Sequence, residues 1–427
     1  MKFDGIIDGG TKPKGKVSVS GAKNSATRLL AATLLGNSPS HLENFPTELV
    51  DVRHKIRLIE EMGCKVILDV AAETLTVDPD RLKTCILDES SNFPIRTTYL
   101  LVAGQILRQG LARIPYPGGC QIGSRGYDLH VMVWQALGCE VTEFPDFIEV
   151  RGTGFQAGKI HFPISTVGGT ENALLCASVA QGTTEIVNAY VTPEIEDLID
   201  FLRRMGSHIE LIGNSRIFVE GSSELQGANK NVMPDRIEAL TWIVYALISG
   251  GEIQVDHVPF DSMEIPLIHL EKAGVDLFRN NSSAYVHPDC MSGGMAQPFE
   301  LACGTHPGII SDMQPFYVLL GAIANGRSQV FDYRYPERIS YVAELAKLCE
   351  HGAMTSKPGQ ITINGAVRFQ PGRARSTDLR GSMALVMAAL CADGRSEIQD
   401  IHMALRGYNR LPEKLAALGN TIEIIDK

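Results

Sequence analysis

Two kinds of apolar segment recur along the chain. Segments such as LLAATLL (29–35) and ALVMAALC (384–391) are apolar at nearly every position, which predicts helices buried on all sides. Segments such as LRRMG (202–206) and KLAALG (414–419) mix apolar and charged positions, as in amphipathic helices that cover a surface. Short stretches rich in β-branched residues follow both kinds and predict strands. The pattern therefore indicates an α/β protein.

Glycines show that this pattern is a repeat. One glycine follows each apolar helix at intervals of 68 to 76 residues, and a second follows each amphipathic helix 24 to 28 residues after the first. Both are expected at helix C-termini, where a left-handed residue is favoured. The first set is Gly36, Gly110, Gly182, Gly250, Gly326 and Gly394, and the second is Gly63, Gly138, Gly206, Gly274, Gly352 and Gly419. Six α/β units are predicted, grouped most simply as two domains of three units with a ligand cleft between them.

The composition limits the classes of function. A formal charge of −10 with 44% apolar residues is typical of a globular protein and argues against a non-specific nucleic-acid binder, whose surface is normally basic. Nine scattered cysteines without a CxxC pair predict reduced thiols rather than disulfides or a zinc site. The N-terminus has no apolar core of signal-peptide length, and apolar runs such as residues 239–249 are too short to span a bilayer. We expect a cytoplasmic protein.

Charged residues stand near the predicted start of each apolar helix. Asp235 with Glu238 has the spacing of a capping box, and Ser311 or Asp378 can also accept a first-turn N–H. Capping does not explain the lysine and arginines, because a cation at a helix N-terminus opposes the helix dipole. An anionic ligand gripped by these cations does explain them. The clusters are Lys23-Asn24, Arg96-Thr97, Thr170-Glu171-Asn172, Asp235-Arg236, Asp312-Met313-Gln314 and Asp378-Leu379-Arg380.

The glycine-rich stretch PYPGGCQIGSRG (115–126) places Cys120 five residues before Arg125. A thiol near arginines and backbone N–H groups has a lowered pKa and therefore a larger thiolate fraction. Flanking glycines allow a loop that closes over a ligand. We expect Cys120 to be a reactive thiol on a lid, unlike the other eight cysteines. Because no GxxxxGK[ST] or HExxH motif occurs, neither a nucleoside-triphosphate site nor a metal centre is indicated, and no cofactor is implied.

Several motifs in this order resemble those of the UDP-N-acetylglucosamine 1-carboxyvinyltransferases, a family of enolpyruvyl transferases. They are SGAKNSATRLLAATLL, PGGCQIG, PDRIE, SDMQ, STDLRGSMALV and RGYNRLPEKLAALG, and they extend over essentially the whole chain. The resemblance implies a two-domain inside-out α/β barrel of six units, three per domain. The implied domains are 22–234, which carries the Cys120 loop, and 1–21 with 235–427, and the implied active site lies in the cleft between them.

The same resemblance implies a reaction. The enolpyruvyl group of phosphoenolpyruvate moves to the 3-hydroxyl of UDP-N-acetylglucosamine and phosphate leaves, which is the first committed step of peptidoglycan synthesis and so serves cell-wall biogenesis, cell shape and cell division. Catalysis is assigned to Cys120 as the lid acid and the target of fosfomycin-type inhibitors, and to Asp312 as the base, with Lys23 and Arg406. Asp378 precedes Arg380 and orients it or relays a proton. The phosphoenolpyruvate site is assigned to Lys23, Arg125, Arg338, Arg380 and Arg406. The UDP-sugar site is assigned to Asn24, Arg96, Arg125, Asp128, Val167, Gly168, Glu194, Asp312 and Arg338.

Four short stretches depart from the family pattern, mostly near the acceptor side. They are Gly126-Tyr127, Ser165–Gly169, Tyr335-Pro336 and Leu405. At the first, the family usually has proline and valine, so Tyr127 is much larger than the usual residue. These departures leave two other hypotheses open. One is an enolpyruvyl transferase that acts on a different nucleotide or nucleotide sugar. The other is a catalytically silent regulator that binds UDP-sugars, although the retention of Cys120, Asp312, Lys23 and the arginines argues against it. The sequence does not specify an oligomeric state.

Overall fold

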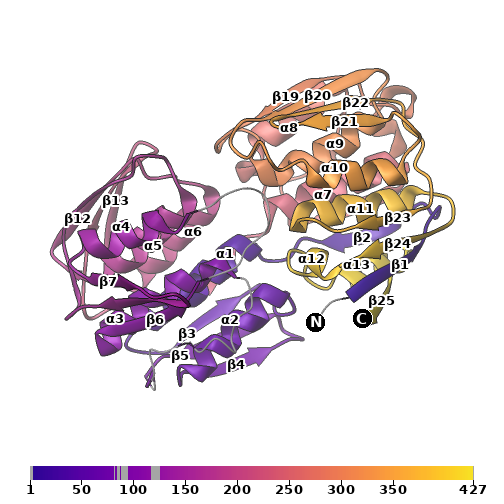
Figure 1. Cartoon of the computed structure of the whole chain (residues 1–427). Coiled ribbons are helices and arrows are strands. Elements are labelled where there is room, and N and C mark those ends of the chain that lie inside the picture. The colour runs from indigo at the N-terminus through magenta and orange to yellow at the C-terminus, as the bar shows by residue number, and fades with distance from the viewer. Residues whose placement is uncertain (1–2, 81, 84–86, 88–94, 117–125, 427) are drawn as a thin grey trace. The chain divides into compact units, whose positions relative to one another are not determined.

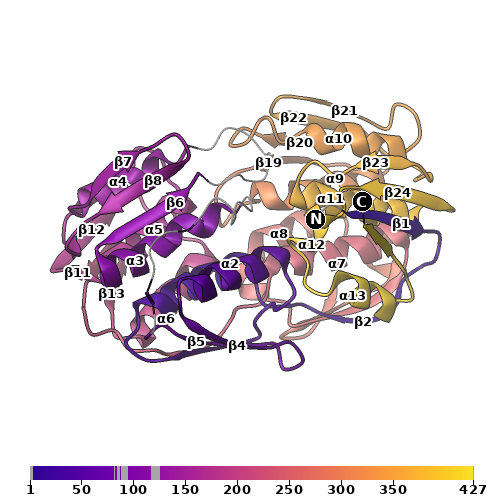
Figure 2. The same ribbon diagram turned by 60° about the horizontal axis from the view of Figure 1, so that its bottom comes forward.

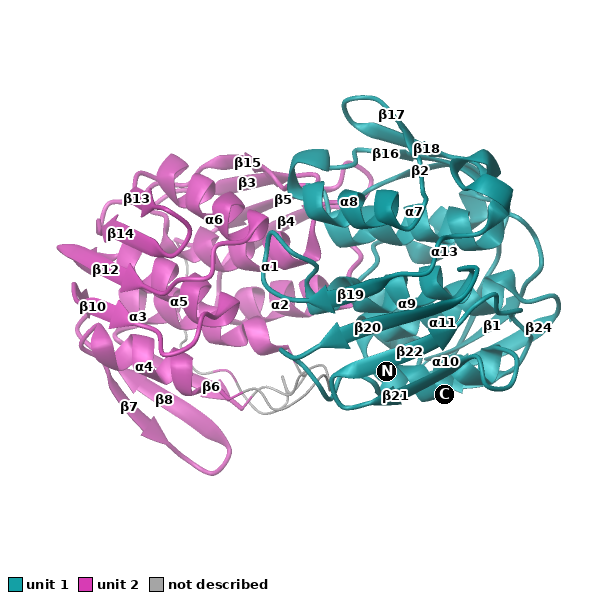
Figure 3. Ribbon diagram, turned by 90° about the horizontal axis from the view of Figure 1, so that it is seen from above, with its two compact units in different colours: residues 1–20, 120–124, 234–427 teal, residues 21–119, 125–233 magenta. Residues whose placement is uncertain are grey.

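The computed structural model describes residues 3–80, 82–83, 87, 95–116 and 126–426. The described chain forms two compact units (Figure 3). Unit 1 comprises residues 3–20 and 234–426, and unit 2 comprises residues 21–116 and 126–233. Each unit contains one of the two tryptophans, Trp242 in unit 1 and Trp134 in unit 2, and both are fully buried. Among the described residues, no helix has the length and apolar character needed to cross a membrane.

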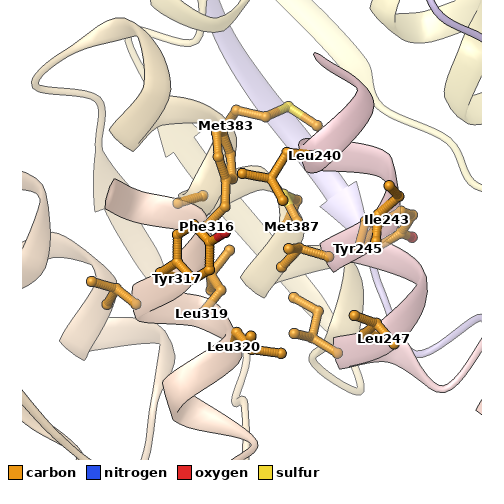
Figure 4. Close-up of a cluster of buried hydrophobic side chains, with 14 of the residues drawn as sticks. Leu240, Ile243, Tyr245, Leu247, Phe316, Tyr317, Leu319, Leu320, Met383 and Met387 are labelled. Atoms are coloured by element: carbon orange, nitrogen blue, oxygen red, sulfur yellow. The ribbon is translucent and has the colours of Figure 1, made fainter. Parts of the chain in front are cut away.

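Unit 1 is built around helices α7 (Arg236–Ser249), α9 (Gln314–Ala322) and α11 (Leu379–Cys391). Every residue of α9 is buried, and so is nearly every residue of α7 and α11, as expected for helices that are apolar on all faces. Leu240, Phe316, Leu320 and Met387 from the three helices belong to one buried cluster (Figure 4). The helices predicted to be buried therefore form the core of this unit.

Three four-stranded sheets surround this core in the described part of unit 1, and all have the same plan. One outer strand runs parallel to its neighbour, and the remaining neighbours pair antiparallel. The first sheet has the order β17 (Phe278–Arg279), β18 (Ser283–Val286), β16 (Glu252–Asp256), β2 (Lys14–Ser18). The second has the order β19 (Glu300–Cys303), β20 (Arg327–Asp332), β22 (Gln360–Asn364), β21 (Met354–Lys357). The third has the order β23 (Arg373–Arg375), β24 (Arg395–Gln399), β1 (Phe3–Asp8), β25 (Glu423–Asp426), so that the N-terminal strand lies between two C-terminal strands (Figure 1).

Unit 2 repeats this plan around helices α1 (Lys23–Ala32), α3 (Val102–Gln109) and α5 (Val167–Ser178). Two of its sheets have the same parallel-then-antiparallel order. They are β15 (Asn229–Asn231), β3 (Ser40–Glu43), β5 (Thr74–Asp78), β4 (Lys65–Asp69), and β10 (Lys159–His161), β12 (Thr183–Val187), β14 (Arg216–Glu220), β13 (His208–Ile212). The described part of the remaining sheet contains the antiparallel strands β6 (Leu111–Pro115), β8 (Phe147–Arg151) and β7 (Glu140–Glu143), and a small pair joins β9 (Phe155–Gln156) to β11 (Ala180–Gln181). The recurring order supports the six predicted α/β units, whereas closure of the sheets into a barrel stays a prediction.

The amphipathic helices lie outside the cores. They are α2 (Val50–Glu61), α4 (Asp128–Ala136), α6 (Pro193–Arg204), α8 (Glu264–Lys272), α10 (Ser340–Leu345) and α13 (Leu411–Ala417), and a short helix α12 (His402–Leu405) precedes α13. Helix α2 lies beside β4 of its own sheet (Figures 1 and 2). Helix α6 shows how local sequence favours these helices: it begins with Pro193 and Glu194 and ends with Arg203 and Arg204, which complement the helix dipole.

The glycine repeat corresponds to real backbone requirements, with one exception. Eleven of the twelve glycines have a positive φ, whereas Gly36 is extended, with φ −77°. Five members of the second set follow an outer helix directly, and their N–H groups and those of the next residues bond back to the last helical turn; these glycines are Gly63, Gly138, Gly206, Gly274 and Gly419. The expectation for the first set was too simple. Gly110 and Gly250 are left-handed C-caps, but Gly182, Gly326 and Gly394 lie three or four residues beyond the helix, in the turn into the next strand.

Gly419 allows the conformational requirement to be tested in isolation. It has φ +81°, and a Cβ atom added there meets no atom within 4 Å, so Gly419→Ala introduces backbone strain without a clash. We expect a loss of about 1–2 kcal/mol in the free energy of unfolding. The matched control is Gly304→Ala, which is equally open but has no positive φ, and should change stability little. Urea unfolding followed by Trp242 fluorescence, in a Trp134→Phe background, measures the stability of both variants. Equal losses of unfolding free energy would contradict a conformational requirement for glycine at position 419.

Candidate functional site

Three aspartates of unit 1 lie at the starts of its buried helices. Asp235 caps α7, and its side chain accepts hydrogen bonds from the N–H groups of Ile237 (2.8 Å) and Glu238 (3.1 Å). Asp378 caps α11 in the same way by accepting from the next-turn amides. Asp312 lies in the 3₁₀ helix η7 (Ser311–Met313) that leads into α9, and its carboxylate is directed to arginines. The predicted capping by Asp235 and Asp378 is confirmed.

Two details of the predicted caps are wrong. Glu238 does not close a capping box: it accepts hydrogen bonds from the backbone N–H of Ser20 and from the indole of Trp242, and forms an ion pair with Lys414. A buried network that joins the N-terminal segment to α7 and α13 therefore replaces the local motif. Ser311 makes no side-chain cap, and its hydroxyl is buried without a hydrogen-bond partner in the part of the chain that the structure describes.

Arg338 joins two of these aspartates. Its Nη1 atom lies 2.6 Å from Asp312 Oδ1, and its Nη2 atom lies 2.8 Å from Asp378 Oδ1. Burial lowers the pKa of Arg338, but the charges of Asp378 and Asp312 outweigh this effect and raise the pKa well above its usual range. The guanidinium is therefore permanently charged. Asp312 is the accessible member of the group, since its side chain is 32% exposed while those of Arg338 and Asp378 are 2% and 3% exposed.

Arg380 adds a second buried guanidinium to the cluster. Its Nη2 atom lies 3.8 Å from Asp235 Oδ2, and its Nε atom lies 4.0 Å from Asp312 Oδ2. The guanidinium also lies over the ring of Tyr408, 5.2 Å from the ring centroid. Burial opposes the charge, but Tyr408, Asp235 and Asp312 together raise the pKa of Arg380.

The buried cluster retains donors for an anionic ligand. Among the described residues, the Nε–H groups of Arg338 and Arg380 have no hydrogen-bond acceptor although both are buried. Unpaired buried donors are uncommon in native proteins. The cluster thus combines fixed positive charge with free N–H groups beside an accessible carboxylate. Arg406, which follows α12, is also buried in unit 1.

In unit 2, the first turn of α1 carries Lys23 and Asn24. Lys23 Nζ lies 2.9 Å from Asp51 Oδ2, and Asp51 is a buried residue in the first turn of α2. Lys23 is therefore a partly exposed cation whose position is set by a buried carboxylate. Sequence reasoning selected Lys23 but missed Asp51.

The remaining predicted residues of unit 2 lie at other helix starts. Arg96 begins the 3₁₀ helix η3 (Arg96–Leu101), and its Nη2 atom donates to the carbonyl of Gly126 over 2.9 Å. Asp128 is the first residue of α4, Val167 and Gly168 are the first two of α5, and the buried Glu194 is the second of α6. Contrary to the prediction from the sequence, the cluster Thr170-Glu171-Asn172 does not lie at the start of its helix. Thr166 caps α5 and the helix begins at Val167, so the cluster begins about one turn inside the helix.

Tyr127, at one departure from the family pattern, has a defined place. Its hydroxyl donates to Glu143 Oε2 over 2.7 Å, and this hydrogen bond raises the pKa of Tyr127 to about 12. Its ring packs against those of Tyr116 and Tyr99, with ring centroids 5.3 and 6.4 Å apart. The larger side chain is therefore part of an aromatic cluster beside Arg96.

Cys120 and Arg125 lie outside the described residues, so their predicted roles stay predictions. The described cysteines are all free, and Cys391 is the one among them that is half-buried rather than buried. Burial raises the pKa of Cys64 and of Cys139 to about 11, which leaves little thiolate at neutral pH.

Two buried ionisable residues of unit 2, Arg28 and Lys55, were missed by sequence reasoning, although their neighbour Glu171 was selected. Arg28 Nε is hydrogen-bonded to Glu171 Oε2, and the buried Lys55 lies near both. The available signal was a lysine within the apolar face of α2, where Val52, Ile56 and Ile59 are also buried.

Comparisons with known proteins identify the family. The profile of the EPSP synthase (3-phosphoshikimate 1-carboxyvinyltransferase) family matches residues 7–415. A curated relative from Trichlorobacter lovleyi, named UDP-N-acetylglucosamine 1-carboxyvinyltransferase, is 33% identical over 424 residues, covering 99% of both chains. A relative of the same name from Zymomonas mobilis is 34% identical over 425 residues, covering 98% of both.

A solved structure supports the fold. The enolpyruvyl transferase NikO from Streptomyces tendae superposes with a TM-score of 0.89 at 24% identity, covering 100% of this chain and 99% of NikO. At that identity the likeness concerns the fold alone. The profile match and the two relatives, each aligned over almost the whole length, show that this chain belongs to the EPSP synthase family of enolpyruvyl (carboxyvinyl) transferases.

Proposed function

We propose that the protein transfers the enolpyruvyl group of phosphoenolpyruvate to the 3-hydroxyl of UDP-N-acetylglucosamine. The names of the full-length relatives support this substrate pair. The observation that carries the chemistry is the partly exposed Asp312, held by the buried Arg338 beside the buried Arg380. A positioned carboxylate next to fixed cations suits proton transfer from a hydroxyl to a base while an anionic co-substrate is bound.

The proposed reaction has two stages. Asp312 removes the proton of the acceptor hydroxyl, whose oxygen bonds to C2 of phosphoenolpyruvate, while Cys120 delivers a proton to the methylene carbon. Loss of a proton from the resulting methyl group and cleavage of the C–O bond to phosphate then restore the double bond. Lys23, Arg125, Arg338, Arg380 and Arg406 bind the phosphate and carboxylate of phosphoenolpyruvate. Binding of the nucleotide sugar is assigned to Asn24, Arg96, Arg125, Asp128, Val167, Gly168, Glu194, Asp312 and Arg338. The product serves peptidoglycan synthesis in the cytoplasm, and through it cell-wall growth, shape and division.

Phosphate release from phosphoenolpyruvate by purified protein, with and without UDP-N-acetylglucosamine, tests the proposal. We expect release only when both substrates are present, together with a nucleotide-sugar product heavier by one carboxyvinyl group in mass spectrometry. Phosphate release that is absent with UDP-N-acetylglucosamine but present with another nucleotide or nucleotide sugar would contradict the proposed acceptor. It would still support enolpyruvyl transfer as the reaction.

A different acceptor is the second candidate, and Tyr127 favours it. The ring of this residue and its hydrogen bond to Glu143 occupy a position beside Arg96 where the family pattern has a smaller residue. Acceptor specificity is therefore best tested with a panel of uridine nucleotides and UDP-sugars. Binding of UDP-sugars, with no phosphate release from phosphoenolpyruvate in the presence of any acceptor, would instead support a silent regulator.

Cys120→Ser should abolish covalent labelling by fosfomycin, because the epoxide requires a thiolate and burial keeps described thiols such as those of Cys64 and Cys139 protonated. Intact-mass spectrometry detects the adduct. We expect one fosfomycin adduct on the parent protein and none on Cys120→Ser. Cys391→Ala, which removes the least buried of the described cysteines, should label like the parent protein. An adduct on Cys120→Ser would exclude Cys120 as the reactive thiol.

A further inference from the structure

Helix α2 buries two ionisable side chains on one face. Asp51 and Lys55 are four residues apart, so both lie on the same side of the helix, and they are 2% and 1% exposed. Asp51 pairs with Lys23, as described above. A lysine is almost never fully buried without a charged partner, and Lys55 therefore requires an explanation.

Lys55 contacts backbone carbonyls instead of a carboxylate. Its Nζ atom donates to Thr27 O over 2.6 Å and to Thr97 O over 2.9 Å. Thr27 lies one turn beyond Lys23 on α1, and Thr97 directly follows Arg96 at the start of η3. One amine thus joins the helix that carries Lys23 to the helix that carries Arg96.

The charges around Lys55 favour an uncharged amine. The buried Arg28 of α1 pairs with the buried Glu171 of α5, so these two charges cancel. Burial lowers the pKa of Lys55 to about 7; Glu171 raises this value and Arg28 lowers it. Burial also raises the pKa of Glu171, and Glu194 of α6 acts in the same direction, which makes Glu171 a weak counter-ion.

The hydrogen-bond geometry leads to the same conclusion independently. A neutral amine has two N–H groups, which match the two carbonyl acceptors of Thr27 and Thr97. A protonated amine has a third N–H, and burying a donor without an acceptor is unfavourable. Asp51 and Arg96, the nearby charges on α2 and η3, are engaged with Lys23 and with the carbonyl of Gly126.

We propose that Lys55 is a positioning residue that, in its uncharged form, ties α1 to η3 and so sets the spacing of Lys23 and Arg96 for the anionic substrates. The proposal rests on the proposed function, because it assigns Lys23 and Arg96 to substrate binding. Lys55 itself is buried and acts through these two residues.

Kinetics with Lys55→Met test the positioning role. Methionine keeps the volume but removes both N–H groups, so we expect KM for the substrates to rise about ten-fold at pH 8, with a smaller change in kcat. Because protonation below about pH 7 disrupts the tie in the parent protein, the ratio of kcat/KM between parent and variant should rise as the pH increases through 7. Lys55→Gln, which restores two uncharged N–H donors, should recover part of the loss, whereas Lys55→Arg, which stays charged, should not.

Two readouts are independent of activity and separate a failure of this inference from a failure of the proposed function. In protein labelled with ¹³Cε-lysine, the resonance that Lys55→Met removes should titrate near pH 7. The unfolded chain keeps Lys55 protonated to about pH 10, so between pH 7 and 10 it binds more protons than the folded state. Stability of the parent should therefore rise with pH relative to Lys55→Met, measured by Trp134 fluorescence in a Trp242→Phe background.

The surface lysine Lys347, which pairs with Glu344, provides the control, since Lys347→Met should alter none of these quantities. A Lys55 resonance that stays protonated to pH 9 would overturn the uncharged form. Unchanged KM values in Lys55→Met, with active parent protein, would overturn the positioning role. If the parent shows no transfer activity, the proposed function fails, and the resonance and the stability slope still decide whether Lys55 is uncharged.

Discussion

Replacing Arg338 by methionine is expected to lower the free energy of unfolding of unit 1 by about 3–5 kcal/mol and to abolish turnover. Arg338 lies between Asp312 and Asp378, with N–O distances of 2.6 and 2.8 Å. Its removal leaves the buried Asp378 carboxylate, which also caps α11, without a counter-ion. The large effect arises from this uncompensated buried charge.

The unfolding of unit 1 can be measured separately, because each unit contains one of the two tryptophans. In a Trp134→Phe background the remaining Trp242 lies in α7, so its fluorescence during urea unfolding reports on unit 1. Arg373→Met is the matched control, because Arg373 also pairs with a carboxylate, Glu397 at 2.9 Å, but is exposed to solvent. An exposed pair contributes at most about 1 kcal/mol. Similar losses of unfolding free energy in the two variants would contradict the strong stabilisation of unit 1 by the buried ion pairs of Arg338.

Asp312→Asn is expected to reduce kcat by about 10²–10⁴-fold while the KM values change little. The amide oxygen can still accept the hydrogen bond from Arg338 Nη1, so the local structure is retained, but the side chain can no longer take up a proton. The loss therefore falls on the proton-transfer step. Initial rates of phosphate release, measured over a range of both substrates, separate kcat from KM.

Glu397→Gln is a close control for Asp312→Asn. The Glu397 side chain is 32% exposed, as is that of Asp312, and it also pairs with an arginine. It lies on β24 and is assigned no role in the reaction. We expect Glu397→Gln to keep full turnover. Full turnover by Asp312→Asn would require a different base.

Much of the fold was predictable because its determinants are local. Helices that are apolar on all faces must be buried, and amphipathic helices must cover a surface. Glycine at the residue after the helix end follows from the left-handed conformation needed there, as Gly63 and Gly419 show. Gly36 marks the limit of this reasoning. The chain leaves η1 (Thr33–Leu35) in an extended conformation with a negative φ, which does not require glycine.

The sequence by itself determined the repeat, the buried helices and the acidic caps Asp235 and Asp378, since each depends on neighbours within a few residues. Only the tertiary structure decided how the charges pair. Arg338 meets partners 26 and 40 positions away, and Glu238 bonds across 218 positions to Ser20 instead of closing its local motif. The position of Lys55 on the apolar face of α2 indicates its burial, but only the packing of that helix decides that backbone carbonyls are its partners. Charged side chains are long and can satisfy many partners, so their pairing follows from the packing of the repeats, which no local pattern specifies.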